Sequence, residues 1–324
     1  MSEVAPPIGG QQHKPGAGGI YRLEELPFTQ LEALDRNRVV VLFTVSPLEE
    51  HGPHLPVGTD LFTADSISQQ VAKRIIEAKP DWTVLIGPDL PLGASAFDRA
   101  GTLLARMRTV RNSVRDYGAA LARHGFRYIL VMNGHGGPRH IVALEEASAA
   151  VSRRYRVRMF SVSGIVLWRF MRGQYSNRLE TILGRSFTPE EREALRGDTH
   201  AGMWETSLVL LFRPDLVDPA YTGLQPAKFR LVDALRRNYP LRLGNRMGYI
   251  GTPSLARAEL GNAAQRLFVD AVWELALPVL DPQNKHWRQT SFLYKIPFLR
   301  SAFPYTALAV ALAAVVWAII HWFY

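Results

Sequence analysis

Several side chains that can bind metal ions lie within one short stretch, 46–60. They are Glu49, Glu50, His51, His54 and Asp60. The stretch follows an apolar run, 39–45, which predicts a buried strand. Ligands bind at the carboxyl ends of strands in open α/β sheets, because the sheet and its helices hold these loops rigidly. The stretch by itself leaves two interpretations open, a metal site and a solvated polar loop with Asp60 as a helix N-cap.

Two further polar clusters favour the metal site. Asn-Gly-His-Gly-Gly, residues 133–137, follows the predicted strand 128–132, and its glycines give the chain a sharp turn beside His135. The other cluster runs over 198–207, where His200 would precede a helix and Glu205 would lie one turn inside it. Carboxylates that gather in a crevice without lysine partners are costly unless a cation compensates them. The three clusters therefore predict one divalent metal ion or a pair.

The composition narrows the ligands of such a metal. The chain of 324 residues has no cysteine, which excludes disulfides, thiolate nucleophiles, zinc ribbons and iron-sulfur clusters. Any metal must therefore be held by His, Asp and Glu, a set that suits zinc, manganese or ferrous iron. Hydrophobic residues make up 47% of the chain and charged residues 21%, which excludes wholesale disorder.

The net charge of +9 raises the question of a polyanionic partner. Six basic residues lie within 228–246 against a single acid, Asp233. A solvated face is the default interpretation of such a stretch, and no zinc finger or RNA-binding motif accompanies it. We therefore expect no nucleic-acid binding, and a membrane surface is the anionic partner to consider.

Helical and strand patterns alternate along most of the chain. We expect strands at 38–45, 82–86, 128–132 and 157–162, and helices at 31–36, 60–78, 110–124, 139–155 and 253–277. Residues 203–212 are expected to form a helix or a buried segment. Thr188 is expected to cap a further helix, and Pro278 to end the last one. Nearly all-apolar strands that alternate with helices predict one α/β domain with a mainly parallel sheet covered on both faces.

The two ends of the chain differ from this domain. Residues 1–19 are rich in Gly, Pro and Gln and predict a disordered tail before a domain at 20–283. The run 303–320 carries no charge, so 303–324 is predicted to be a transmembrane tail anchor behind a juxtamembrane linker, 284–302. Basic residues before the run predict a domain on the cytoplasmic side of the membrane. A packing or oligomer helix is the alternative.

The polar clusters resemble those of the creatininase (creatinine amidohydrolase) family in order and spacing. The resemblance rests on Glu-Glu-His-Gly-Pro-His-Leu-Pro at 49–56, Gly-Thr-Asp at 58–60, Asn-Gly-His-Gly-Gly at 133–137, and His-Ala-Gly with Glu-Thr-Ser within 200–207. A later Gly-Thr-Pro at 251–253 also matches, so the resemblance spans roughly 20–280. It implies a three-layer αβα domain, two neighbouring divalent metal ions and a homo-oligomer.

The resemblance also implies which residues bind the metals. Glu49, Asp60 and His135 would hold one ion, and His51 with a bridging Asp60 the other. Creatininase completes the second site with a glutamate at the position of Gly137 here. We take Glu205 as the replacement fifth ligand.

The remaining residues of the clusters are assigned to catalysis or to the surroundings of the site. His200 matches the family position credited with proton transfer, and would give a proton to the departing nitrogen. A group of substrate-contacting or supporting residues comprises Glu50, His54, Asp98, Arg99 and Asp198. For Asp98 and Arg99 a surface ion pair is an equal alternative.

Two departures from the family pattern affect the substrate. The segment 96–100 lacks the histidine and the Phe-Pro pair usual there, and Pro138 replaces a common asparagine. These changes argue against creatinine. We expect a membrane-tethered, metal-dependent hydrolase of the C–N bond in a small cyclic or linear amide. The alternatives are a peptidase-like enzyme that matures a modified precursor peptide, and an inactive scaffold.

Overall fold

The computed structural model describes residues 18–229 and 246–303, together with positions 307, 310, 314 and 317. Within these residues one sheet of parallel strands has the order β1-β3-β2-β5-β6, and β4 pairs with β2. The strands are β1 (Gly19–Arg22), β2 (Val39–Ser46), β3 (Thr83–Ile86), β4 (Leu90–Pro91), β5 (Tyr128–Met132) and β6 (Arg158–Ser161).

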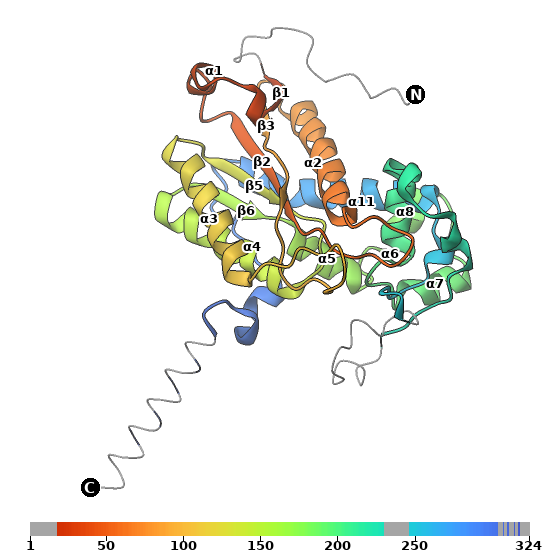
Figure 1. Ribbon diagram of the computed structural model, residues 1–324. Helices are drawn as coiled ribbons and strands as arrows, with labels where there is room; N and C mark the ends of the chain where they lie inside the picture. Colours follow the sequence, from red (N-terminus) through yellow and green to blue (C-terminus); the bar gives the residue numbers. More distant parts are fainter. Residues whose placement is uncertain are drawn as a thin grey trace.

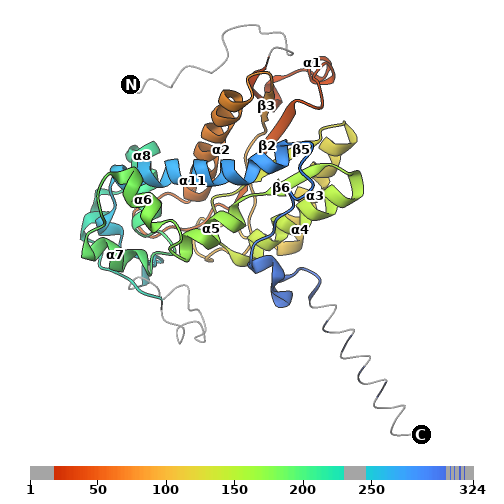
Figure 2. The same cartoon turned by 180° about the vertical axis from the view of Figure 1, so that it is seen from behind.

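Helices cover both faces of this sheet (Figure 1). They are α1 (Phe28–Glu32), α2 (Thr59–Ala78), α3 (Met107–Arg123), α4 (Pro138–Tyr155), α5 (Ser163–Met171), α6 (Ser176–Leu183), α7 (Pro189–Leu195), α8 (Met203–Phe212) and α11 (Ala258–Leu280). Helices α3 and α4 lie on one face, while α2 and the long α11 lie on the other, where α11 crosses the sheet (Figure 2). The predicted α/β architecture with a mainly parallel sheet is thus confirmed.

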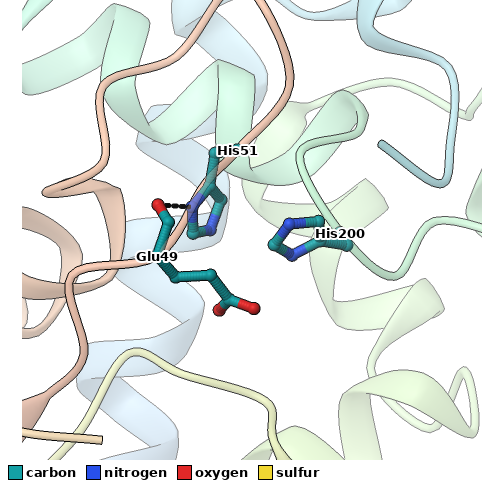
Figure 3. A group of neighbouring side chains, drawn as sticks. All are labelled: Glu49, His51 and His200. Atoms are coloured by element: carbon teal, nitrogen blue, oxygen red, sulfur yellow. Dashed lines mark hydrogen bonds between the residues drawn. The ribbon is translucent and has the colours of Figure 1, made fainter. Parts of the chain in front are cut away.

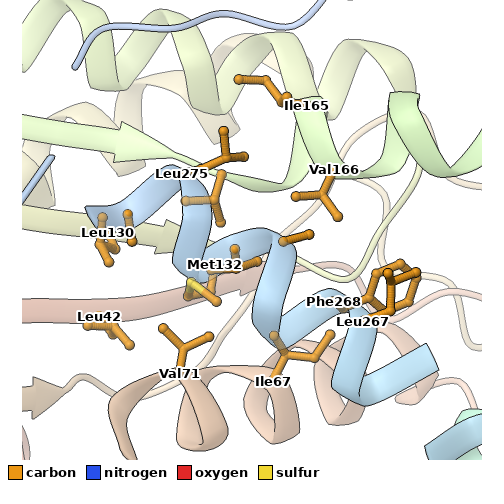
Figure 4. Packing of buried hydrophobic residues seen from close by; sticks show 14 of the residues in the cluster. Leu42, Ile67, Val71, Leu130, Met132, Ile165, Val166, Leu267, Phe268 and Leu275 are labelled. Atoms are coloured by element: carbon orange, nitrogen blue, oxygen red, sulfur yellow. The ribbon is translucent and has the colours of Figure 1, made fainter. Parts of the chain in front are cut away.

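Neighbouring residues of the central strands pack into different cores, because side chains alternate across a strand. Leu42 and Leu130 lie in the larger core with α2, α5 and α11, where Val71 and Leu275 pack beside them (Figure 4). Phe43 and Val131 point to the other face, against α3 and α4. Burial on both faces explains why these strands are apolar at every position.

The order of the strands creates a crevice at one edge of the sheet. From β2 the chain passes to β3 on one side, and β5 pairs with β2 on the other side. Loops that leave β2 and β5 therefore separate at a topological switch point, where open α/β sheets bind their ligands. The two loops are 47–58 and 133–137, which carry the polar clusters of the sequence.

The boundaries of α2, α4 and α8 agree with the predicted helices within one residue, whereas the helix predicted at 31–36 lies at Phe28–Glu32 and the one predicted to start at 253 starts at Ala258. Thr188 caps α7 in a capping box with Glu191. The last helix differs, because α11 continues through Pro278 to Leu280. Pro278 disturbs only the final turn there, and the Arg158 guanidinium donates hydrogen bonds to the carbonyls of Pro278 and Val279 at 3.2 and 3.1 Å.

The structure describes only part of the predicted N-terminal tail and of the predicted C-terminal segments. Residues 1–17 of the predicted tail lie outside the described residues, and Gly19 already begins β1. The segment predicted as a linker, 284–302, packs on the domain: Ser291 and Ser301 are buried and bond to Glu145 and Glu146 of α4. Most of the basic stretch, 230–245, also lies outside the described residues.

The predicted transmembrane helix is not supported. Among the residues that the structure describes, no helix is both long enough and apolar enough to cross a bilayer. Of the predicted anchor, 303–324, only positions 303, 307, 310, 314 and 317 are described. The finding overturns the predicted membrane location with its cytoplasmic orientation, and the predicted lipid partner is not shown.

Candidate metal centre

The structure brings five of the predicted ligands together at the switch point. Glu49, Asp60 and His135 form one group whose ligand atoms lie within 4.8 Å of one another, and His51, Asp60 and Glu205 form a second. Asp60 belongs to both groups. Its Oδ2 lies 3.1 Å from His135 Nδ1, and its Oδ1 lies 3.4 Å from His51 Nε2. The two groups therefore share one carboxylate with a different oxygen turned to each side.

Backbone carbonyls fix the orientation of both histidines. His51 Nδ1 lies 3.0 Å from the carbonyl oxygen of Glu49 (Figure 3), and His135 Nε2 lies 3.2 Å from that of Ala94. A carbonyl oxygen only accepts, so these nitrogens carry the proton and donate. In the neutral rings, His51 Nε2 and His135 Nδ1 then keep lone pairs that point at carboxylate oxygens. This is the arrangement in which proteins present histidine to a metal.

The charges around these rings require a cation. His135 Nδ1 lies 2.9 Å from Glu49 Oε2, and His51 Nε2 lies 3.6 Å from Glu205 Oε2. Burial disfavours the charged form of His51, but Asp60 and Glu205 outweigh burial and raise the pKa of His51 to about 10. Burial opposes the same change at His135, yet Glu49 and Asp60 raise its pKa well above the usual value. Either a proton on these rings or a metal ion bound to them would neutralise the charge of the surrounding carboxylates.

Two carboxylate oxygens favour a bound metal ion over a bound proton at this centre. Glu49 Oε2 and Asp60 Oδ2 are buried, and neither has a hydrogen-bond partner of suitable geometry among the described residues. Buried carboxylate oxygens without partners are costly, and a metal ion satisfies them directly. Oxygen and imidazole donors of this kind fit zinc or manganese. The residues present therefore fit a pair of divalent ions.

His200 lies beside the two groups. Its ring lies beside that of His51 (Figure 3), with the two ring centroids 4.4 Å apart. The centroid of the Phe97 ring is 4.5 Å from that of His200. His200 Nε2 lies 2.8 Å from the carbonyl oxygen of Glu50, which places the proton on Nε2 and a lone pair on Nδ1. Burial first, and the charge of His51 second, lower the pKa of His200 to about 4, below the neutral range expected for a proton donor.

The turn after β5 is built around Asn133, which the sequence analysis treated only as part of a motif. Asn133 Oδ1 accepts from the backbone N–H of His135 at 2.9 Å and from Ser46 Oγ at 3.0 Å, while Nδ2 donates to the carbonyl oxygen of His135 at 2.7 Å. Gly134 allows the turn to approach α2, since a Cβ there would lie 2.3 Å from the carbonyl oxygen of Asp60. These contacts position the His135 ring.

The absence of a side chain at Gly137 also has a structural reason. A Cβ at Gly137 would lie 2.2 Å from His135 Nε2 and 2.8 Å from the carbonyl oxygen of Ser95. A glutamate would need these atoms to move. Glu205 approaches instead from α8, and its Oε2 accepts from the backbone N–H of Ala201.

The predicted supporting residues lie at different distances from the centre. Glu50 is buried, but its carboxylate accepts from Gly52 N–H at 3.0 Å and lies outside both metal-capable groups. His54 Nε2 pairs with Thr206 Oγ1 at 2.9 Å and links the loop to α8. Asp198 accepts from the first N–H groups of α8, those of Met203 and Trp204, at 2.8 Å each.

Asp98 and Arg99 belong to none of the metal-capable groups. Asp98 is exposed, and the Arg99 guanidinium donates to the carbonyl oxygen of Arg246. The loop that carries them still touches the centre through Phe97, whose backbone N–H donates to Glu49 Oε1. Sequence reasoning did not find this contact, because a backbone donor has no residue signature.

A cavity adjoins the centre. His200, Glu205 and the turn of Asn133 line one part of it, and apolar residues of α2, α5, α8 and α11 line the rest. The fold and the site together define an α/β protein with a metal-capable centre at the carboxyl edge of a parallel sheet.

Comparisons with known proteins agree with this class. The family model described as "Creatininase: Creatinine amidohydrolase" matches residues 24–276. The chain therefore belongs to the creatininase family, a family of metal-dependent amidohydrolases.

Two curated relatives have different names. A mycofactocin precursor peptide peptidase of Mycobacterium ulcerans is 28% identical over 240 residues, which cover 72% of this chain and 81% of that protein. A creatinine amidohydrolase of Pseudomonas putida is 28% identical over 203 residues, which cover 60% of this chain and 72% of that protein.

Solved structures of creatininase share the fold. One described as creatinine amidohydrolase (creatininase) has a TM-score of 0.61 at 24% identity and covers 81% of this chain and 98% of its own. Others are described as "Creatininase Mn" and, for a mutant, as "Zn-Zn type".

Proposed function

We propose that this protein is a dinuclear metal-dependent hydrolase that cleaves a C–N bond in a small amide. The observation that carries the proposal is the pair of groups that share Asp60, each with one histidine lone pair turned to the carboxylates. Glu49, Asp60 and His135 would hold one ion, and His51, Asp60 and Glu205 the other. The manganese and zinc forms named for solved relatives support this choice of metals.

When bound, such ions supply Lewis acidity and bring the pKa of a water near neutrality. The surrounding residues of the chain orient the ligands and the proton carrier. His51 and His135 are held by backbone carbonyls, so that each presents a single nitrogen to the centre. His200 keeps its Nε2 proton on the Glu50 carbonyl, so its Nδ1 is the atom that can take a proton and return it to the departing nitrogen.

Removal of the metal tests the proposal. Purified protein is treated with a chelator, and its metal content is measured by mass spectrometry before and after zinc or manganese is restored. We expect about two ions per chain, loss of amide hydrolysis on chelation and recovery on addition. Fewer than about one ion per chain in fully folded, untreated protein would contradict a dinuclear centre.

A peptidase-like activity is the second candidate. The curated peptidase of Mycobacterium ulcerans aligns with more of this chain than does the creatinine amidohydrolase of Pseudomonas putida. Incubation with candidate precursor peptides, followed by mass spectrometry, separates the two activities. A shortened peptide formed only by metal-loaded protein would support the peptidase.

The homo-oligomer implied by the family resemblance remains a prediction. Light scattering of the purified chain measures it, and a monomeric mass would contradict the expected homo-oligomer.

A further inference from the structure

The cavity beside the metal centre has a chemical character of its own. Its walls come from α2, α5, α8 and α11, and the side chains that shape it include Ile67, Val166, Leu167, Phe170, Trp204 and Phe268. Most are buried or half-buried, so the cavity reaches from the centre into the larger core. Figure 4 shows Val166, Ile67 and Phe268 among the packed side chains of this core.

Charged side chains line the cavity only at its metal end. They are Asp198 and Glu205, and both oxygens of Asp198 are already used by the N–H groups of Met203 and Trp204. Among the described residues that line the cavity there is no lysine or arginine. A substrate group with a negative charge would therefore lose its hydration without gaining a partner.

Polar atoms contribute little to the accessible wall of the cavity. Trp204 and Thr63 line it, but Trp204 Nε1 and Thr63 Oγ1 are enclosed by protein and have no hydrogen-bond partner among the described residues. They therefore offer no hydrogen bond to a ligand in the cavity. The wall is thus mainly apolar, as is typical of sites for small molecules.

We propose that the substrate carries an uncharged, predominantly apolar group beside its scissile amide, and that this group binds in the cavity. The inference rests on the proposed function, because the amide must lie at the metal centre for the group to reach the cavity. It narrows the substrate class to hydrophobic amides and excludes amides with an acidic group at that position.

Three simple amides test the proposal by calorimetric titration of the metal-loaded protein. Hexanamide and 5-carboxypentanamide have six carbons each and differ in a terminal methyl or carboxylate, and acetamide lacks the chain. We expect hexanamide to bind at least about tenfold more tightly than either of the others, since a hydrophobic pocket discriminates about tenfold or more per methylene. Affinities within about threefold of one another would overturn the proposal.

Variants of the cavity wall connect this preference to the cavity. Leu167 is half-buried and Met171 is 61% exposed, so both positions tolerate a polar side chain. Leu167→Glu should remove the preference for hexanamide, and Leu167→Met is the matched control that should keep it. If Leu167→Glu does not fold, Met171→Glu at the more exposed position replaces it in the test. This variant should weaken the preference for hexanamide. An unchanged preference in a folded glutamate variant would overturn the proposal.

Hydrolysis of the same amides distinguishes the two proposals. Metal-dependent hydrolysis together with equal binding of all three amides would contradict the cavity assignment alone. Preferred binding of hexanamide by protein that holds no metal and hydrolyses nothing would contradict the proposed function alone.

Discussion

Two regions of the molecule bury carboxylates in different ways. At the metal centre, Glu49 and Asp60 each keep a buried oxygen without a hydrogen-bond partner, and both face histidine nitrogens. On α4, Glu145 is equally buried, but Ser291 donates to it through its backbone N–H at 3.0 Å and through its hydroxyl at 3.1 Å. The second carboxylate is satisfied by its neighbours, whereas the first pair is satisfied only by a cation.

The difference distinguishes the bridging acid Asp60 from a structural acid. It does not extend to the proposed ligand Glu205, because burial raises the pKa of Glu205 to about 7 as well. Burial raises the pKa of Glu145 to about 7, so this group meets the cost of burial by taking up a proton. The Asp60 carboxylate shows the opposite shift, since His51 and His135 outweigh burial and hold its pKa well below the usual value. A carboxylate kept charged inside the protein is a candidate ligand.

The largest expected effect follows from the bridging carboxylate. Asp60→Asn removes the charge shared by both groups, and we expect metal affinity to fall by at least about 100-fold, because even residues that only support ligands contribute about 10- to 100-fold. Metal content by mass spectrometry and amide hydrolysis measure the loss. Glu145→Gln is the matched control and should retain both. Equal metal content in the two variants would remove the contrast between the regions.

The next effect concerns His200. His200→Gln should lower hydrolysis by about 10²- to 10⁴-fold, the usual contribution of a general acid or base, and should leave the metal content unchanged. His200 also lies within a third group that could hold a metal, with Glu49 and His51. A parallel loss of metal would therefore show that His200 is a ligand instead of a proton carrier.

A smaller effect is expected at Asn133, which lies behind the ligands. Asn133→Ala removes the bonds that hold the His135 turn and should weaken metal binding by about 10- to 100-fold. A titration of chelator-treated protein with zinc measures the affinity. Ser148→Ala is a control, because Ser148 is also buried and its hydroxyl donates within α4, to the carbonyl oxygen of Leu144 at 2.8 Å. Equal zinc affinities would mean that the turn holds its shape without Asn133.

A separate effect concerns stability and its dependence on pH. The folded pKa of Glu145, about 7, lies above its ordinary value, so between about pH 4.5 and 7 the folded state binds more protons than the unfolded state. Its contribution to stability is therefore present below about pH 4.5 and is lost as the pH rises to 7, by an amount on the order of 3 kcal/mol.

Urea unfolding of wild type and Glu145→Gln at pH 5 and 8 measures this contribution. The glutamine cannot ionise, so the free energy of unfolding of the variant should fall less between the two pH values. The same fall in both proteins would contradict the assignment.

Much of the fold could be predicted from the sequence because its signals are local. The strand at 128–132 was predicted with the boundaries that β5 has, and Thr188 was predicted as the cap of α7 from a hydroxyl followed by proline and acids. The helix end predicted at Pro278 was wrong, because Pro278 lies in the last turn of α11, where the carbonyls of Pro278 and Val279 accept from Arg158, which lies 120 residues from Pro278 in the chain. The membrane prediction rested on composition alone and was overturned.

At the candidate site, too, local sequence signals predicted some features, and contacts between distant segments decided others. The sequence by itself determined which residue types could bind metal, since cysteine is absent and the acids and histidines form three compact clusters, two after predicted strands and one at the start of a predicted helix. Only the tertiary structure decided how these clusters meet, with Asp60 between His51 and His135. It also showed that Glu50 and His54 bond to Gly52 and Thr206, and that Asp198 caps the start of α8. The physical reason is that ligand geometry depends on contacts between segments far apart in the chain, which no local pattern encodes.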